Sequence, residues 1–108
     1  MWTDWEKKVD PNAKLPAHLF WDVNINKMDW QAAKYFVAER VVERGMPEDY
    51  YTLFQMYGGV EGVREILKNV KYFRYPQDIA FVCMAFDLKK EEMVCYKRKL
   101  LREALLSS

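Results

Sequence analysis

Apolar side chains recur along this chain at the three- and four-residue spacing that places them on one face of an α-helix. No Asn-Gly or Asp-Gly pair marks a tight hairpin. The pattern therefore predicts an all-α fold, a single compact bundle of about five helices with an N-terminal arm. One domain is expected over residues 1–108, with the arm and a connector in 1–28 and the helical core in 29–106.

Prolines, glycines and one acidic cap mark where the first predicted helices begin and end. Asp29 is typical of an N-cap, so we expect a helix over residues 30–44 that Gly45 ends in the left-handed conformation. Pro47 is tolerated in a first helical turn and begins the next helix, which ends at Gly58.

The second half of the chain predicts three more helices. One follows the paired glycines and carries an apolar stripe over residues 63–70. Pro76 begins a segment that is apolar on all sides, which indicates either a central helix or a buried strand. Helix is favoured because no other segment offers a partner strand. The last helix is predicted from Glu91 onward.

The connector from Leu15 to Asp22 is bulky, because Leu19, Phe20 and Trp21 stand where small polar residues are common. We interpret these three side chains as a plug that holds the connector against the core. The residues expected inside the core are Trp21, Trp30, Val37, Val41, Leu53, Phe54, Val63, Leu67, Val82 and Phe86.

Two polar residues of the connector and two arginines of the first core helix are candidates for special roles. His18 and Asp22 would suit an acid/base pair, although hydrogen bonding of both to the backbone is the favoured interpretation. Arg40 and Arg44 border the apolar face of their helix. Because an unpaired buried cation is costly, Arg40 is predicted to bind a carboxylate such as Asp22 or an acid of the following helix.

Composition indicates a folded, soluble globule. Apolar residues make up 51% of the chain and charged residues 31%. The net charge of +1 does not favour any class of binding partner. The longest apolar run, residues 79–86, is too short to span a bilayer, and the first residues do not resemble a signal peptide. A cytoplasmic location without membrane contact is therefore expected, and two cysteines suit free thiols in a reducing compartment.

The residues needed for catalysis are scarce. Serine occurs only as Ser107 and Ser108 and threonine only as Thr3 and Thr52, so a hydroxyl nucleophile has almost no place in the chain. The single histidine and two cysteines lack the spacing of zinc ligands, and the glycines at 58, 59 and 62 lack the lysine of a phosphate loop. We expect no catalytic residue, no metal and no cofactor.

A helix-turn-helix corner over residues 47–70 suggests DNA binding as an alternative function. Its second helix would offer Arg64, Lys68 and Lys71 to a duplex. The standard motif has a small residue before the turn glycine and an aliphatic residue after it, whereas this chain has Phe54 and Arg64 there. The spacing therefore argues against the standard helix-turn-helix motif, and DNA binding stays the alternative function.

The C-terminal helix combines cations with leucines. Six of the 17 basic residues fall in the last 20 positions, and the leucines continue beyond the point where a small core needs them. We predict that this helix docks on another protein. The candidate partner-binding residues are Trp21, Asp22, Lys97, Arg98, Leu101, Arg102 and Leu105.

Several short motifs resemble one family of small uncharacterised bacterial proteins with the motif LPxHLFWD. The resemblance covers about residues 13–97 and assigns no catalytic residue. Its motifs are Leu15-Pro16-x-His18-Leu19-Phe20-Trp21-Asp22, Asp29-Trp30, residues 39–45, Tyr57-Gly58 and residues 66–69. Within them, His18, Phe20, Trp21, Trp30, Arg40 and Arg44 are expected to be structural. Members are often encoded beside nucleotidyltransferase toxins of the AbiEii type, which implies an antitoxin-like or accessory role.

The sequence thus favours a non-enzymatic protein-interaction or regulatory module whose partner is another protein, and the resemblance points to a nucleotidyltransferase toxin. A DNA-binding transcriptional regulator is the alternative. The sequence does not determine whether the chain forms a homo-oligomer.

Overall fold

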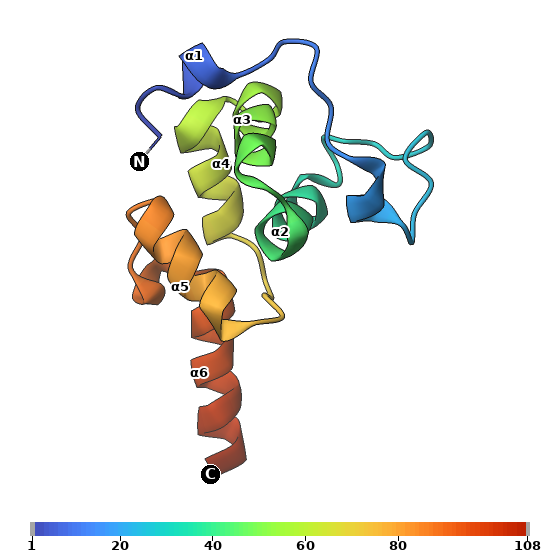
Figure 1. Cartoon of the computed structure of the whole chain (residues 1–108). Coiled ribbons are helices and arrows are strands. Elements are labelled where there is room, and N and C mark those ends of the chain that lie inside the picture. The colour runs from blue at the N-terminus through green and yellow to red at the C-terminus, as the bar shows by residue number, and fades with distance from the viewer. Residues whose placement is uncertain (1, 108) are drawn as a thin grey trace.

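A computed structural model describes residues 2–107, and every regular element in that range is helical (Figure 1). The elements are α1 (Trp5–Lys8), η1 (Ala17–Phe20), α2 (Lys34–Arg44), α3 (Pro47–Met56), α4 (Gly59–Lys68), α5 (Pro76–Ala85), η2 (Lys90–Glu92) and α6 (Val94–Ser107), where η denotes a 3-10 helix. The predicted all-α bundle is confirmed, and the segment after Pro76 is a helix rather than a strand.

The three helices α2, α3 and α4 form the centre of the fold, with α4 packed against both of the others. Eight of the ten predicted core residues are buried there or in the adjoining α5: Val37, Val41, Leu53, Phe54, Val63, Leu67, Val82 and Phe86. The prediction is wrong for Trp21, which is 60% exposed. It is only partly met by Trp30, which is half-buried and packs against the core.

The corner between α3 and α4 depends on its glycines. Gly58 and Gly59 adopt positive φ angles of 85° and 79°, which side chains larger than hydrogen disfavour. A Cβ atom at Gly62 would overlap the carbonyl oxygen of Tyr57. The glycines therefore allow a close turn between two helices, as the sequence indicated.

Two helix boundaries differ from the predicted ones. The carboxylate of Asp29 accepts the backbone N–H groups of Gln31 and Ala32, both at 3.1 Å, but residues 30–33 form turns and α2 begins only at Lys34. Gly45 is extended (φ −79°, ψ 166°) rather than left-handed. The chain thus leaves α2 in an extended conformation and enters α3 at once.

The last two helices also differ from the sequence-based expectation. α5 is not central, since only Val82 and Ala85 are buried in it and Met84 is 65% exposed. α6 begins at Val94 rather than Glu91, because η2 intervenes and the carboxylate of Glu92 accepts the Lys89 N–H at 2.8 Å. An apolar composition on all sides of α5 therefore did not translate into burial on all sides.

Beyond its first turn, α6 extends away from the other helices (Figure 1). The Cα radius of gyration is 14.7 Å, against about 13 Å for a compact chain of this length, and the principal extents are 52 × 33 × 20 Å. Among the described elements, α6 makes its main contacts with η2. The bundle is therefore elongated by one projecting helix.

Candidate protein-binding surfaces

The connector is attached to the bundle by three buried side chains, of which Leu15 is the least deeply buried at 9% exposure. Leu19 and Phe20 lie in η1 and are 0% and 2% exposed. The ring of Phe20 packs edge-on against Trp30, with centroids 5.5 Å apart, and also contacts Phe36. The plug interpretation is confirmed for Leu19 and Phe20. It is wrong for Trp21, because the 3-10 turn directs the two preceding side chains inward and leaves Trp21 on the surface.

Arg40 binds this connector through the two terminal nitrogens of its guanidinium group. One nitrogen donates to the Leu19 carbonyl oxygen at 3.0 Å, and two nitrogens donate to the Asp22 carboxylate at 2.9 and 2.6 Å. The guanidinium carbon also lies 4.5 Å from the ring centroids of Trp21 and Phe36. The predicted pairing of Arg40 with a carboxylate is confirmed, and of the two alternatives the partner is Asp22. This hydrogen bonding lowers the pKa of the Asp22 carboxyl.

Trp21, Asp22, Arg40 and Arg44 together form what we call the connector corner. The guanidinium carbon of Arg44 lies 4.5 Å from the Trp21 ring centroid, as does that of Arg40. Exposed tryptophan and arginine side chains are enriched among the residues that dominate protein-protein binding. His18 is exposed, and no hydrogen bond in the described chain joins it to Asp22, whose carboxylate is bound by Arg40.

The helix α6 presents the second surface. Every residue from Lys97 to Ser107 is exposed, including the candidate residues Lys97, Arg98 and Arg102. Its four leucines expose large fractions of their surface: Leu100 47%, Leu101 62%, Leu105 68% and Leu106 79%. Only Cys95 is buried in this 14-residue helix. An apolar surface of this kind is typical of a protein-binding segment.

The three candidate DNA-binding cations of the helix-turn-helix corner, Arg64, Lys68 and Lys71, have different surroundings. Arg64 donates to the carbonyl oxygens of Phe86 and Asp87 at 2.9 and 3.1 Å, which joins α4 to the end of α5. Lys68 lies 3.9 Å from the Glu65 carboxylate, and Lys71 is exposed beyond the end of α4. The structure therefore does not bring the three into one free basic row.

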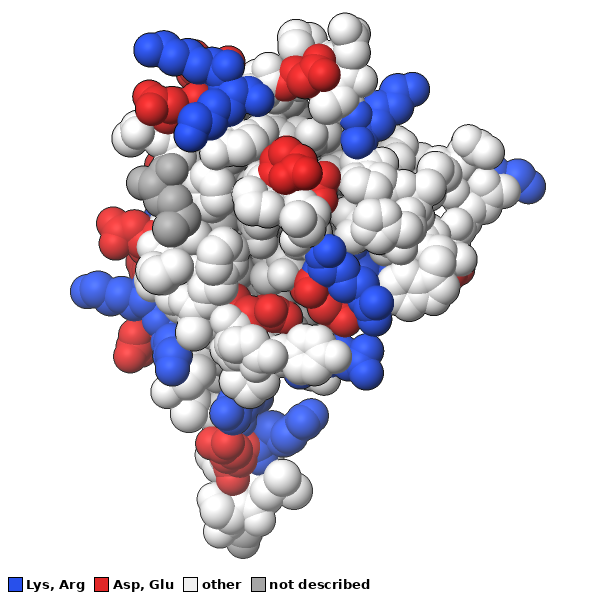
Figure 2. Space-filling model, in the orientation of Figure 1, with Lys and Arg blue, Asp and Glu red and all other residues white. Residues whose placement is uncertain are grey.

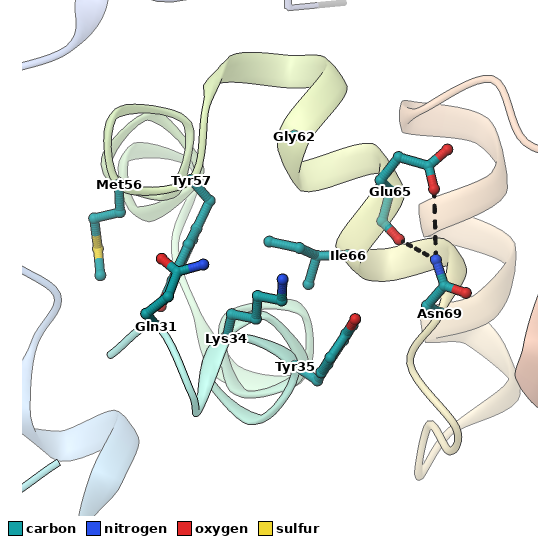
Figure 3. Close-up of a pocket in the computed structure, with 9 residues that line it drawn as sticks. All are labelled: Gln31, Lys34, Tyr35, Met56, Tyr57, Gly62, Glu65, Ile66 and Asn69. Atoms are coloured by element: carbon teal, nitrogen blue, oxygen red, sulfur yellow. Dashed lines mark hydrogen bonds between the residues drawn. The ribbon is translucent and has the colours of Figure 1, made fainter. Parts of the chain in front are cut away.

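A hollow of about 420 Å³ opens between the start of α2 and the α3–α4 corner (Figure 3). Lys34 and Tyr35 line it from one side and Glu65 and Asn69 from another. Two of its polar residues bind each other, since the Asn69 amide nitrogen donates to the Glu65 carbonyl oxygen at 2.8 Å. Sequence reasoning missed this hollow, because its lining comes from helix ends that are far apart in the chain.

Tyr57 is a lining residue of the hollow that is fixed by a hydrogen bond. Its hydroxyl donates to the Trp30 carbonyl oxygen at 2.8 Å, and burial raises its pKa to about 12. A tyrosine held in this way stays protonated at neutral pH and acts as a structural donor.

The described residues provide no group of three or more His, Cys, Asp or Glu side chains arranged for a metal ion. Burial raises the pKa of both the Cys83 and Cys95 thiols, which disfavours the reactive thiolate. None of the helices over residues 2–107 has both the length and the apolar character that crossing a bilayer requires.

Residues 15–67 match the model of a family of unknown function (DUF6922). The match covers just under half of the chain, from the connector through most of α4, and supports a domain of unknown function in this region. No curated protein and no solved structure matches the chain. The connector corner lies inside the matched residues, whereas α5 and α6 lie outside them.

Proposed function

We propose that this chain is a non-catalytic protein-interaction module that binds its partner chiefly through α6. The observation that carries the proposal is the exposure of every side chain from Lys97 to Ser107 on a helix with four leucines. Isolated helices of about 12–15 residues are marginal in water, and most helical stability in proteins comes from packing an apolar face. A partner that covers α6 would supply that packing.

The partner class comes from the resemblance of residues 15–22 and the other motifs to bacterial proteins encoded beside AbiEii-type nucleotidyltransferase toxins. The proposed role is antitoxin-like or accessory, in the bacterial cytoplasm. The connector corner offers a second contact, because its Trp21 ring and Arg44 side chain are exposed. A partner that covered both surfaces would contact the connector as well as α6.

The test is co-expression of the full chain with the cognate nucleotidyltransferase, followed by gel filtration. We expect a stable complex that Leu101→Asp weakens by tenfold or more, about 1.4 kcal/mol, because a carboxylate is placed in an apolar contact. Leu106→Asp is the matched control, since it makes the same change about 140° around the helix. It should weaken the complex much less.

Two results would contradict the proposal. A complex that forms equally well with Leu101→Asp would show that α6 is not the binding surface. Salt-sensitive binding of the isolated chain to promoter DNA, with no protein partner recovered, would instead support the DNA-binding alternative over residues 47–70.

A further inference from the structure

The cations of α6 are placed beside its leucines in a regular arrangement. Lys97, Leu101 and Leu105 follow one another at four-residue spacing and therefore lie along one row of the helix. Arg98 and Arg102 lie along the adjacent row, one position further along the chain. A partner that packs on Leu101 therefore meets positive charge at the end and along one edge of the apolar contact.

None of these cations is neutralised within the described chain. The ion pairs of residues 2–107 involve arginines 40, 44 and 74 and Lys68, and none involves a cation of α6. The helix carries four cations, Lys97, Arg98, Lys99 and Arg102, against one carboxylate, Glu103. In Figure 2, basic and acidic side chains are mixed over the visible face of the body, and the projecting segment carries charged side chains above a largely uncharged tip.

We propose that the partner segment of α6 is an amphipathic helix of another protein whose apolar row is flanked by glutamate or aspartate. This inference rests on the proposed function and adds the chemistry of the partner. Carboxylates beside the apolar row would pair with Arg98 and Arg102, as flanking charges do in paired helices, and such pairs select the partner. A second copy of this chain fits less well, because each copy would bring four cations and one carboxylate into the same contact.

The probe is a pair of synthetic helical peptides with the same leucine row, one flanked by glutamates and the other by lysines. Binding of the labelled peptides to the full chain is measured by fluorescence anisotropy at low and high salt. We expect the acidic peptide to bind at least tenfold more tightly at low salt, a difference of about 1.4 kcal/mol. Roughly 1 M salt, where the Debye length is about 3 Å, should remove most of that preference.

Charge reversal supplies the decisive variant. Arg98→Glu combined with Arg102→Glu should invert the preference toward the lysine peptide. Lys7→Glu combined with Lys71→Glu makes the same net change at exposed positions outside α6 and should leave the preference unchanged.

Three outcomes would overturn the inference. Equal binding of the two peptides, or no binding of either, would show that α6 has no preference for an acidic partner. The proposed function would still be supported if the complex with the toxin forms and Leu101→Asp weakens it. Tighter binding of a DNA duplex than of the acidic peptide would point to nucleic acid. Self-association of the chain that Leu101→Asp abolishes would identify a second copy as the occupant.

Discussion

At the scale of single residues, Arg40 is the side chain that joins the connector to α2. It satisfies the Leu19 carbonyl oxygen, binds the Asp22 carboxylate through two nitrogens and lies against two aromatic rings. Arg44 shares with Arg40 only the stacking on Trp21. Its Nε atom lies 3.5 Å from a carboxylate oxygen of Glu43. Two arginines one helical turn apart therefore have different roles, one structural and one available at the surface.

Replacing Arg40 by methionine should destabilise the protein by about 1 to 3 kcal/mol, because the carbonyl oxygen of fully buried Leu19 loses its side-chain donor. Arg44→Met, the matched control, should stay within about 0.5 kcal/mol, since Arg44 itself is exposed and the Glu43 carboxylate keeps Arg74 as a second partner at 3.7 Å. Urea unfolding followed by circular dichroism measures both. Equal effects of the two changes would show that the bonds of Arg40 do not anchor the connector.

At the scale of elements, α6 differs from the helices that build the core. Four residues are buried in α2 and five in α3, whereas in the longer α6 only Cys95 is buried. Residues just before and at its start, including fully buried Met93, attach it to the bundle. The rest of α6, residues 97–107, is exposed.

Deleting residues 97–108 should therefore change the free energy of unfolding by less than about 1 kcal/mol, because residues 97–107 are all exposed. Met93→Ala is the contrasting variant and should cost about 2 to 5 kcal/mol, as truncation of a buried side chain does. Chemical denaturation compares the two. A loss above about 2 kcal/mol for the deletion would mean that α6 packs against the body in solution.

At the scale of the whole molecule, the N-terminal arm connects parts of the fold that are far apart in sequence. The ring of Trp2 stacks on Tyr50 of α3 and on Phe86 at the end of α5, with centroids 5.4 and 5.6 Å away. Its indole N–H donates to the Ala85 carbonyl oxygen at 2.8 Å. Trp2 precedes and α5 follows residues 15–67, the region that matches the family model. Segments on either side of the matched region therefore contact each other in the fold.

Trp2→Ala should lower the free energy of unfolding by roughly 2 kcal/mol, less than the 3–5 kcal/mol typical of a fully buried tryptophan because Trp2 is half-buried. Thr3→Ala, at an exposed neighbouring position, is the control and should be close to neutral. Thermal and urea unfolding measure the difference. If Trp2→Ala were as neutral as the control, the arm would not be part of the stable fold.

Patterns in the amino-acid sequence were sufficient to predict the helical class, most of the buried face of each central helix and the α3–α4 corner. These features follow from local rules, because a spacing of three or four residues sets the face of Val63 and Leu67, and glycines at 58 and 59 permit positive φ. The sequence also predicted that Arg40 pairs with a carboxylate, since a cation beside an apolar face needs one, but it left Asp22 and an acid of the following helix as alternatives. DNA binding, partner identity and the absence of catalysis are still predictions.

Which helix faces have a neighbour to pack against became evident from the three-dimensional arrangement of the helices. Trp21 and Phe20 are adjacent aromatics with similar propensities, yet one is exposed and the other buried, because the direction of the 3-10 turn selects between them. Trp2, which looked like part of a peripheral arm, completes an aromatic cluster with α3 and α5. The leucines of α6 follow the same helical spacing as core residues but extend beyond the bundle. Burial depends on contacts between segments that are distant in the chain, and the residue spacing within one segment gives no information about those contacts.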